Sequence, residues 1–210
     1  MQKENLSMRT DFYEETAGIY RLRVPFDRIY TSVFLVVTEE LAFLVDCATT
    51  DEDVDTHIVP ALHRLGYEPS DVGKILLTHR HRDHAGGLSR LLAHAPHMEV
   101  VTEPCEMASG IIGYPLSGHT VDSLGVLDGR SHTLISGDGL QGAGVDKYRC
   151  GLKEPERYLE TLERIRGDER VENILFSHAY EPWNSDRVFG RDGVLRCLEQ
   201  CKECMKGRKI

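Results

Sequence analysis

The sequence of 210 residues lacks three features that would place it in common protein classes. It has no apolar run long enough to cross a membrane, so a membrane protein is not expected. Basic residues are fewer than acidic ones, 25 against 34, and they form no cluster that could follow a nucleic-acid backbone. The first residues, MQKENL, lack the apolar core of a signal peptide, which favours a cytoplasmic protein. The expected partner is therefore a small-molecule substrate.

The six cysteines are scattered along the chain, and in a cytosolic protein they are expected to be reduced. Cys197, Cys201 and Cys204 recur at helical spacing within a predicted helix, so they share one of its faces. We expect them to be small buried residues, with a metal or redox site as the alternative.

The length of the chain suits one domain, expected to span residues 1–210 and to bury a substantial core. The spacing of apolar residues predicts an α/β fold. Strands are expected at residues 18–24, 32–38, 41–45, 74–78, 98–102, 124–127, 132–136 and 171–176, the last of these being the final strand along the chain. Helices are expected at residues 51–66, 84–94, 104–109, 155–165 and 192–204, and residues 1–16 are expected to be peripheral.

The densest group of potential metal ligands lies in residues 78–87, THRHRDHAGG, between a predicted strand and a predicted helix. In an extended loop His79, His81 and Asp83 would point to one side, because strand side chains alternate. His84 would then turn with the first helical residues. Imidazole and carboxylate are ligands that Zn(II), Fe(II) and Mn(II) accept. The loop therefore predicts a metal centre, and it could serve two neighbouring ions.

This loop resembles the H-x-H-x-D-H signature of the metallo-β-lactamase superfamily. The family also has a later histidine, a metal-bridging aspartate and a last histidine. The segments GHT (118–120), SGDG (136–139) and FSHA (176–179) stand here in that order. The resemblance implies that one metal ion is bound by His79, His81 and His119, and the other by Asp83, His84 and His178, with Asp138 between them. It also implies the four-layer αββα sandwich of the family and two divalent ions, zinc first, with iron or manganese as alternatives.

Asp46 ends the predicted strand 41–45. In the family an aspartate at this place supports the metal loop, because a buried carboxylate can orient a ligand histidine through its other ring nitrogen. The alternative is an aspartate that caps the following helix. Cys47 departs from the family pattern, and we expect it to be a small buried residue.

The connection between His84 and His119 is shorter than in larger relatives, which place additional strands there. We expect a sheet edge or a wall of the site to be missing. Apolar surface left open in this way tends to be buried against a partner, so a homodimer is expected.

The loop after Asp138 carries three residues that could bind an anionic substrate, Lys147, Tyr148 and Arg149. Tyr180, which follows the last ligand, could line the same site. Arg80 and Arg82 alternate with the ligands of the metal loop, so they are expected to point away from the metals.

The predicted activity is that of a dinuclear metal-dependent hydrolase, in which a metal-bridging hydroxide attacks an ester, thioester, lactone or amide. The expected catalytic residues are the two carboxylate ligands, Asp83 and Asp138. No nucleophile-elbow motif for a serine hydrolase is present. The ligands resemble those of hydroxyacylglutathione hydrolases, although the C-terminal helical domain of those enzymes has no counterpart here, which disfavours glutathione thioesters.

Two other functions remain open at this point. In sulfur dioxygenase relatives a single iron is bound by two histidines and one aspartate, which match His79, His119 and Asp138. A non-catalytic metal-binding protein is the other alternative, and it would be indicated by a broken ligand set.

Overall fold

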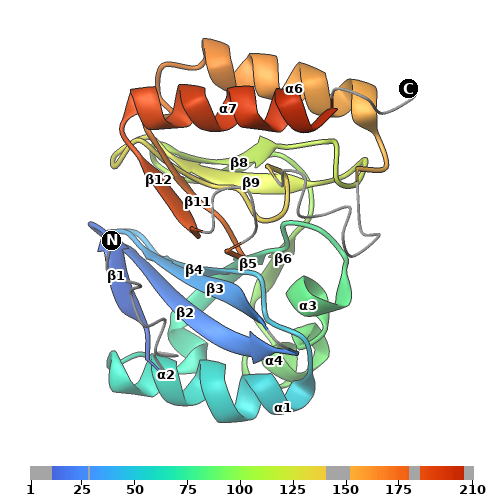
Figure 1. Ribbon diagram of the computed structural model, residues 1–210. Helices are drawn as coiled ribbons and strands as arrows, with labels where there is room; N and C mark the ends of the chain where they lie inside the picture. Colours follow the sequence, from blue (N-terminus) through green and yellow to red (C-terminus); the bar gives the residue numbers. More distant parts are fainter. Residues whose placement is uncertain (1–10, 28, 141–151, 180–184, 206–210) are drawn as a thin grey trace, which may run out of the picture. The chain divides into compact units, whose positions relative to one another are not determined.

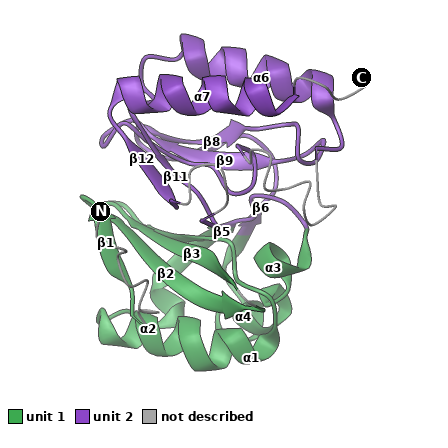
Figure 2. Cartoon of the chain, in the orientation of Figure 1, with its two compact units in different colours: residues 1–75, 81–99 green, residues 76–80, 100–210 purple. Residues whose placement is uncertain are grey.

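The computed structural model describes residues 11–27, 29–140, 152–179 and 185–205. The chain forms two compact units (Figure 2). Unit 1 consists of residues 1–75 and 81–99, and unit 2 of residues 76–80 and 100–210. The prediction of one domain over residues 1–210 stays a prediction.

The first sheet has six strands in the order β1-β2-β3-β4-β5-β6 (Figure 1). They are β1 (Tyr13–Thr16), β2 (Ile19–Phe26), β3 (Ile29–Val37), β4 (Ala42–Val45), β5 (Val72–Leu76) and β6 (Glu99–Val101). The first four pair antiparallel, and β3 and β4 are almost wholly buried, as their continuous apolar runs indicate. The predicted strands are confirmed. Of residues 1–16, which were expected to be peripheral, Tyr13–Thr16 form the edge strand β1 paired with β2, and residues 1–10 lie outside the described ranges.

The helices of unit 1 cover one face of its sheet (Figure 1). The predicted helix 51–66 is confirmed as α1 (Asp51–Asp53), a π-helical turn (Val54–Ile58) and α2 (Val59–Arg64). A 3-10 turn (Pro69–Asp71) then leads into β5. The predicted helix 84–94 is instead split into α3 (Arg82–Ala85) and α4 (Leu88–His94), which the Gly86-Gly87 pair separates.

The second sheet also has six strands, in the order β12-β11-β10-β9-β8-β7 (Figure 1). They are β7 (Glu106–Ala108), β8 (Ile111–Pro115), β9 (Leu124–Asp128), β10 (Thr133–Ile135), β11 (Asn173–Leu175) and β12 (Arg187–Phe189). In this sheet β10 and β11 pair in parallel, and the other neighbouring strands pair antiparallel.

Two predictions for this sheet are wrong. Residues 104–109 were expected to form a short helix, yet Glu106–Ala108 is strand β7, which pairs with β8 as an antiparallel hairpin. This hairpin forms an edge of the sheet in the stretch where an edge was expected to be missing. Residues 171–176 do contain a strand, but β12 follows it and takes the other edge.

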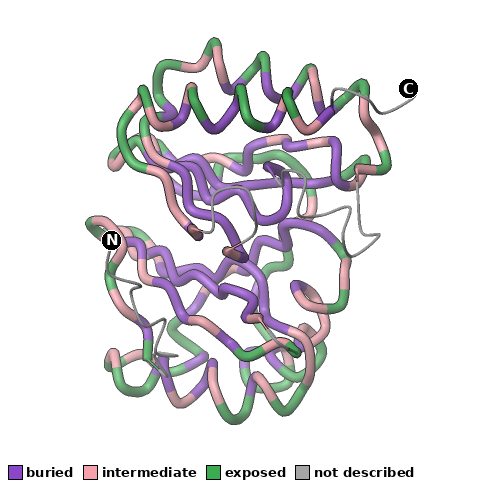
Figure 3. Tube along the Cα trace, in the orientation of Figure 1, coloured by how far each residue is buried: buried purple, intermediate pink, exposed green. Residues whose placement is uncertain are grey.

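Two helices cover one face of the second sheet, α6 (Pro155–Gly167) and α7 (Arg191–Met205) (Figure 1). Their sheet-facing sides are buried (Figure 3) and share one core with the strands, in which Tyr158, Leu162 and Leu198 are fully buried. Cys197 and Cys201 belong to this core, and Cys204 is partly exposed, so the predicted shared face of α7 is confirmed.

Arg191, at the start of α7, ties three parts of unit 2 together. Its guanidinium donates to the carbonyl oxygens of Ile165, Asp168 and Val171, at 3.4, 3.1 and 2.8 Å, and also to that of Arg166. These carbonyls belong to the end of α6 and to the segment that enters β11. The Arg191 side chain therefore links α7 to both of these parts. None of the helices within the described ranges is long and apolar enough to cross a membrane.

Candidate metal centre

His79 and Asp138, both in unit 2, lie in the segments that follow two strand ends, β5 ending at Leu76 and β10 ending at Ile135. Thr78 and Gly137, the residues just before them, are in close contact: a Cβ atom at Gly137 would lie 2.6 Å from that of Thr78. Gly137 also has a φ angle of 53°, which favours glycine. The glycine therefore allows the two strand ends to approach and brings the next residues, His79 and Asp138, together.

Asp138 stands among three histidines of unit 2. Its Oδ2 atom lies 4.0 Å from Nε2 of His79 and 3.7 Å from Nε2 of His119. Its other oxygen, Oδ1, lies 3.4 Å from Nε2 of His178. All four side chains are buried, and Asp138 is only 6% exposed.

These separations suit shared metal ions better than direct hydrogen bonds. Two ligand atoms at about 2.0–2.1 Å from one tetrahedral ion are separated by roughly 3.4 Å, whereas a hydrogen bond brings them to about 2.7–3.2 Å. The imidazole and carboxylate donors are also those that zinc prefers. The two oxygens of Asp138 face different histidines, Oδ2 facing His79 and His119 and Oδ1 facing His178.

Gly118, the residue before His119, contacts α6 and the two residues that precede this helix. The carbonyl of Gly118 accepts hydrogen bonds from the backbone N–H groups of Lys153 and Glu154, both at 3.0 Å. The Tyr158 side chain packs so closely on Gly118 that a Cβ atom there would meet it at 2.6 Å. The rings of His79 and His119 then meet edge to face, with centroids 4.7 Å apart.

In unit 1, His81 precedes the short helix α3, which carries Asp83 and His84. Nε2 of His84 lies 3.5 Å from Oδ2 of Asp83, again too far for a good hydrogen bond and suitable for two ligands of one ion. Nδ1 of His84 lies 2.7 Å from Oδ2 of the buried Asp46. Asp46 thus engages one ring nitrogen and leaves Nε2 directed at the Asp83 side.

Asp46 does not cap the following helix, since Thr50 does so with the help of Asp53. Cys47 is fully buried, as expected for a small filler residue, but its Sγ also lies 3.3 Å from the carbonyl oxygen of His84. Burial, followed by the charge of Asp46, raises the pKa of the Cys47 thiol well above its usual range, so the thiol is protonated.

The predicted substrate residues Lys147, Tyr148, Arg149 and Tyr180 lie outside the described residues. The Arg80 side chain is 73% exposed, with Nε 4.0 Å from Oδ2 of Asp122. Tyr158 and the backbone N–H groups of Lys153 and Glu154 are not among the predicted site residues. No signal in the sequence connects them with Gly118, because the contact joins segments that are distant along the chain.

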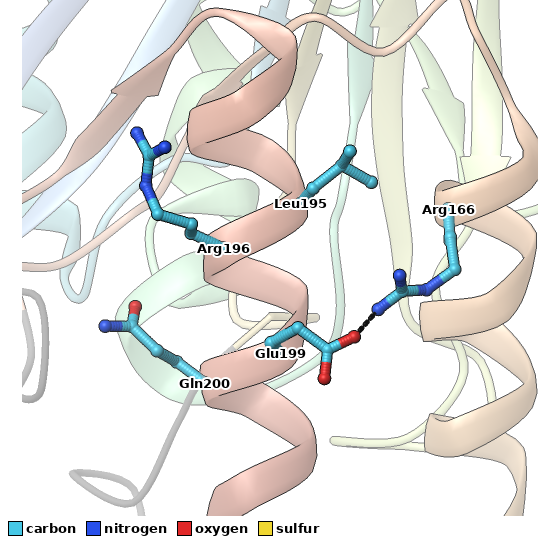
Figure 4. Close-up of a pocket in the computed structure, with 5 residues that line it drawn as sticks. All are labelled: Arg166, Leu195, Arg196, Glu199 and Gln200. Atoms are coloured by element: carbon cyan, nitrogen blue, oxygen red, sulfur yellow. Dashed lines mark hydrogen bonds and ion pairs between the residues drawn. The ribbon is translucent and has the colours of Figure 1, made fainter.

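A shallow groove on unit 2, of about 320 Å³, lies on α6 and α7 (Figure 4). Arg166 and Glu199 form an ion pair across it, and Leu195, Arg196 and Gln200 complete its lining. None of the predicted site residues lines this groove.

The chain is similar in sequence to known proteins. The family profile described as the metallo-beta-lactamase superfamily matches residues 27–104. A hydroxyacylglutathione hydrolase from Vibrio campbellii is 32% identical over 168 residues, which cover 65% of this chain and 64% of the relative. The thioesterase pkgB of Emericella nidulans is 29% identical over 151 residues, which cover 65% of this chain and 42% of that protein. The chain therefore spans less than two thirds of the length of these two relatives.

Solved structures with the same fold include a metallo-β-lactamase from Erythrobacter litoralis, with a TM-score of 0.66 and 21% identity over 91% of this chain and 96% of the other. The metallo-β-lactamase FIM-1 from Pseudomonas aeruginosa, in its mono-zinc form, gives a TM-score of 0.68 and 14% identity over 94% and 98%. These likenesses confirm the α/β fold of the metallo-β-lactamase type, with its two six-stranded sheets and their helices. The chain is thus similar to members of the metallo-β-lactamase superfamily, in sequence over residues 27–104 and in fold over most of its length.

Proposed function

We propose that this protein is a metal-dependent hydrolase with a dinuclear centre, and that thioesters are its first candidate substrates. The observation that supports it most is the position of Asp138, whose two oxygens face different histidines at 3.4–4.0 Å. The names of the relatives, a hydroxyacylglutathione hydrolase and a thioesterase, favour thioesters over lactones and amides.

The proposed ligand sets follow the family pattern and use seven side chains. His79, His81 and His119 would bind one ion, Asp83, His84 and His178 the other, and Asp138 both. Zinc is the first candidate because of the histidine-rich donor set, with iron and manganese as alternatives.

When bound, two such ions would supply Lewis acidity and lower the pKa of water toward neutrality. The chain's own residues have other tasks in this proposal. Asp83 and Asp138 are the carboxylates next to the reacting group. Asp46 fixes the tautomer and the direction of His84 through its 2.7 Å contact. Lys147, Tyr148 and Arg149 would bind an anionic group of the substrate.

The test combines elemental analysis with an activity panel. Protein produced with zinc, iron or manganese is analysed for metal per chain, stripped with a chelator, and reloaded with each ion. Each form is then assayed on a thioester, an ester, a lactone and a phosphodiester. The expected result is two ions per chain and thioester hydrolysis that disappears and returns with the metal.

A stoichiometry that never exceeds one ion per chain, with iron preferred, would refute the dinuclear hydrolase and support the mononuclear-iron alternative. Two bound ions without hydrolysis of any substrate would support a metal-binding role without catalysis. Asp122→Asn is a suitable control, because Asp122 is half exposed and is not among the proposed ligands.

A further inference from the structure

The turn between β4 and α1 has an unusual backbone. Asp46 and Ala48 both have positive φ angles, 63° and 60°, although neither is glycine. Such conformations are sparsely populated for residues with a side chain and persist only where surrounding contacts stabilise them. The contacts of this turn therefore identify the part of the chain that stabilises its backbone conformation.

Every residue of the turn contacts the metal loop within unit 1. Asp46 Oδ2 lies 2.7 Å from Nδ1 of His84. The backbone N–H of Cys47 donates to the carbonyl oxygen of His84 at 2.8 Å, and the Cys47 thiol lies 3.3 Å from the same oxygen. The carbonyl of Ala48 accepts a hydrogen bond from the N–H of Gly86 at 3.0 Å.

The His84 carbonyl needs partners from outside its helix. Helix α3 has only four residues, so the carbonyls near its end have no intrahelical donor. A carbonyl oxygen has two lone pairs, and Cys47 offers two donors, its N–H and its S–H. Cys47 can thus satisfy both acceptor positions of a carbonyl in a fully buried residue.

Close packing fixes the same arrangement. A Cβ atom at Gly87 would lie 2.4 Å from the carbonyl oxygen of Cys47, and one at Gly86 would lie 2.0 Å from that of Thr49. The two glycines therefore allow the turn and the metal loop to approach to hydrogen-bonding distance, and the loop has no room to slide along the turn.

We propose that Cys47 is a positioning residue for the metal ligand His84. Its thiol and backbone N–H fix the His84 carbonyl, while Asp46 fixes the ring, so that both ends of the residue are held and Nε2 keeps its direction. This inference rests on the proposed function, in that His84 is taken as a metal ligand. It assigns to the thiol a task that a small buried residue without a donor could not perform.

The test compares Cys47→Ala and Cys47→Ser with wild type in the full-length protein. Cys197→Ala is the matched control, because it makes the same substitution at another buried cysteine, on α7. Dissociation constants for Zn(II) are measured by chelator competition, and the absorption bands of the Co(II)-loaded protein report the ligand geometry. The melting temperature of each metal-free variant reports folding.

Cys47→Ala should weaken binding of one ion about 10-fold, the lower end of the effect of removing outer partners of metal ligands, and should alter the Co(II) spectrum. Cys47→Ser, which retains a donor, should remain within about threefold of wild type. Cys197→Ala should lower only the melting temperature.

Three results would overturn the inference. Wild-type affinity and spectrum in Cys47→Ala would show that the thiol does not position His84. An equal loss in Cys47→Ser and Cys47→Ala would show that packing, and not the hydrogen bond, is responsible. A wild-type protein that binds no metal would refute the proposed function and this inference with it, whereas the first two results leave the proposed function intact.

Discussion

Replacing Asp138 by asparagine should remove most of the thermal stabilisation that a bound metal ion gives the wild-type protein. Asp138 is only 6% exposed and its carboxylate lies within 4.0 Å of His79, His119 and His178, which is why we propose it as a metal ligand. Asparagine has the same shape but no charge, and it is a much poorer ligand for a divalent ion. The fold of the metal-free protein should therefore survive, while the metal should no longer stabilise it.

The size of the effect follows from linkage. An ion that binds only the folded state, at a free concentration 1,000 times its dissociation constant, stabilises the protein by about 4.1 kcal/mol. For a chain of this length each kilocalorie per mole shifts the melting temperature by about 2–4 °C. One occupied site should thus raise the melting temperature of the wild type by about 8–16 °C over the chelator-treated protein.

Differential scanning fluorimetry in zinc buffers, with and without chelator, measures this difference. Asp138→Asn should lose most of the zinc-dependent rise, whereas Asp122→Asn, at a side chain that is half exposed, should keep it. Equal stabilisation of Asp138→Asn and wild type by zinc, or a wild type without any zinc-dependent rise, would contradict the role of Asp138 as a metal ligand.

Four further outcomes are expected. His178→Ala should remove mainly one ion and most hydrolysis while the fold persists; elemental analysis and kcat check this, and wild-type turnover would contradict it. Asp46→Asn should weaken metal binding about 10–100-fold without removing a ligand, as outer partners of metal ligands do, which chelator competition can show or disprove. Lys147→Ala and Arg149→Ala should raise KM for an anionic substrate about 10-fold, since a hydrogen bond to a charged group contributes roughly 1.5–3 kcal/mol, with metal content unchanged; an unaltered KM in the double variant argues against anion binding there. Light scattering should show a dimer, and monomers alone at micromolar concentration would remove that proposal.

The strands and helices that could be predicted from the sequence are those whose buried face is continuous along the chain. β3 and β4 are buried on both faces, and the helix that begins at Asp51 keeps helical spacing through its π-helical turn. In both cases the local pattern and the tertiary burial agree, so the pattern alone was sufficient.

The errors have a common physical cause. Residues 104–109 begin with a proline that suits the first turn of a helix, yet pairing with β8 makes Glu106–Ala108 a strand. β12 is likewise only three residues long and depends on β11 for its hydrogen bonds. Short edge strands owe their structure to a neighbour that the local sequence does not reveal.

The candidate metal ligands could be named because their spacing within each motif is short. Their surroundings could not, since the contacts of Gly118 with Tyr158 and of Gly137 with Thr78 join distant segments. The role of Cys47 depends on a distance between its sulfur and a backbone oxygen, and a sequence pattern contains no such information.

The contacts of Arg191 limit how freely this sequence can vary outside its motifs. A guanidinium presents several N–H groups in one rigid plane, and here they reach backbone carbonyls on both sides of the α6–β11 connection. Lysine has the same charge but a single nitrogen, which cannot span that set of acceptors. Replacement of Arg191 by lysine is therefore expected to be poorly tolerated. Because the acceptors are backbone carbonyls, this requirement for arginine does not depend on which side chains surround it.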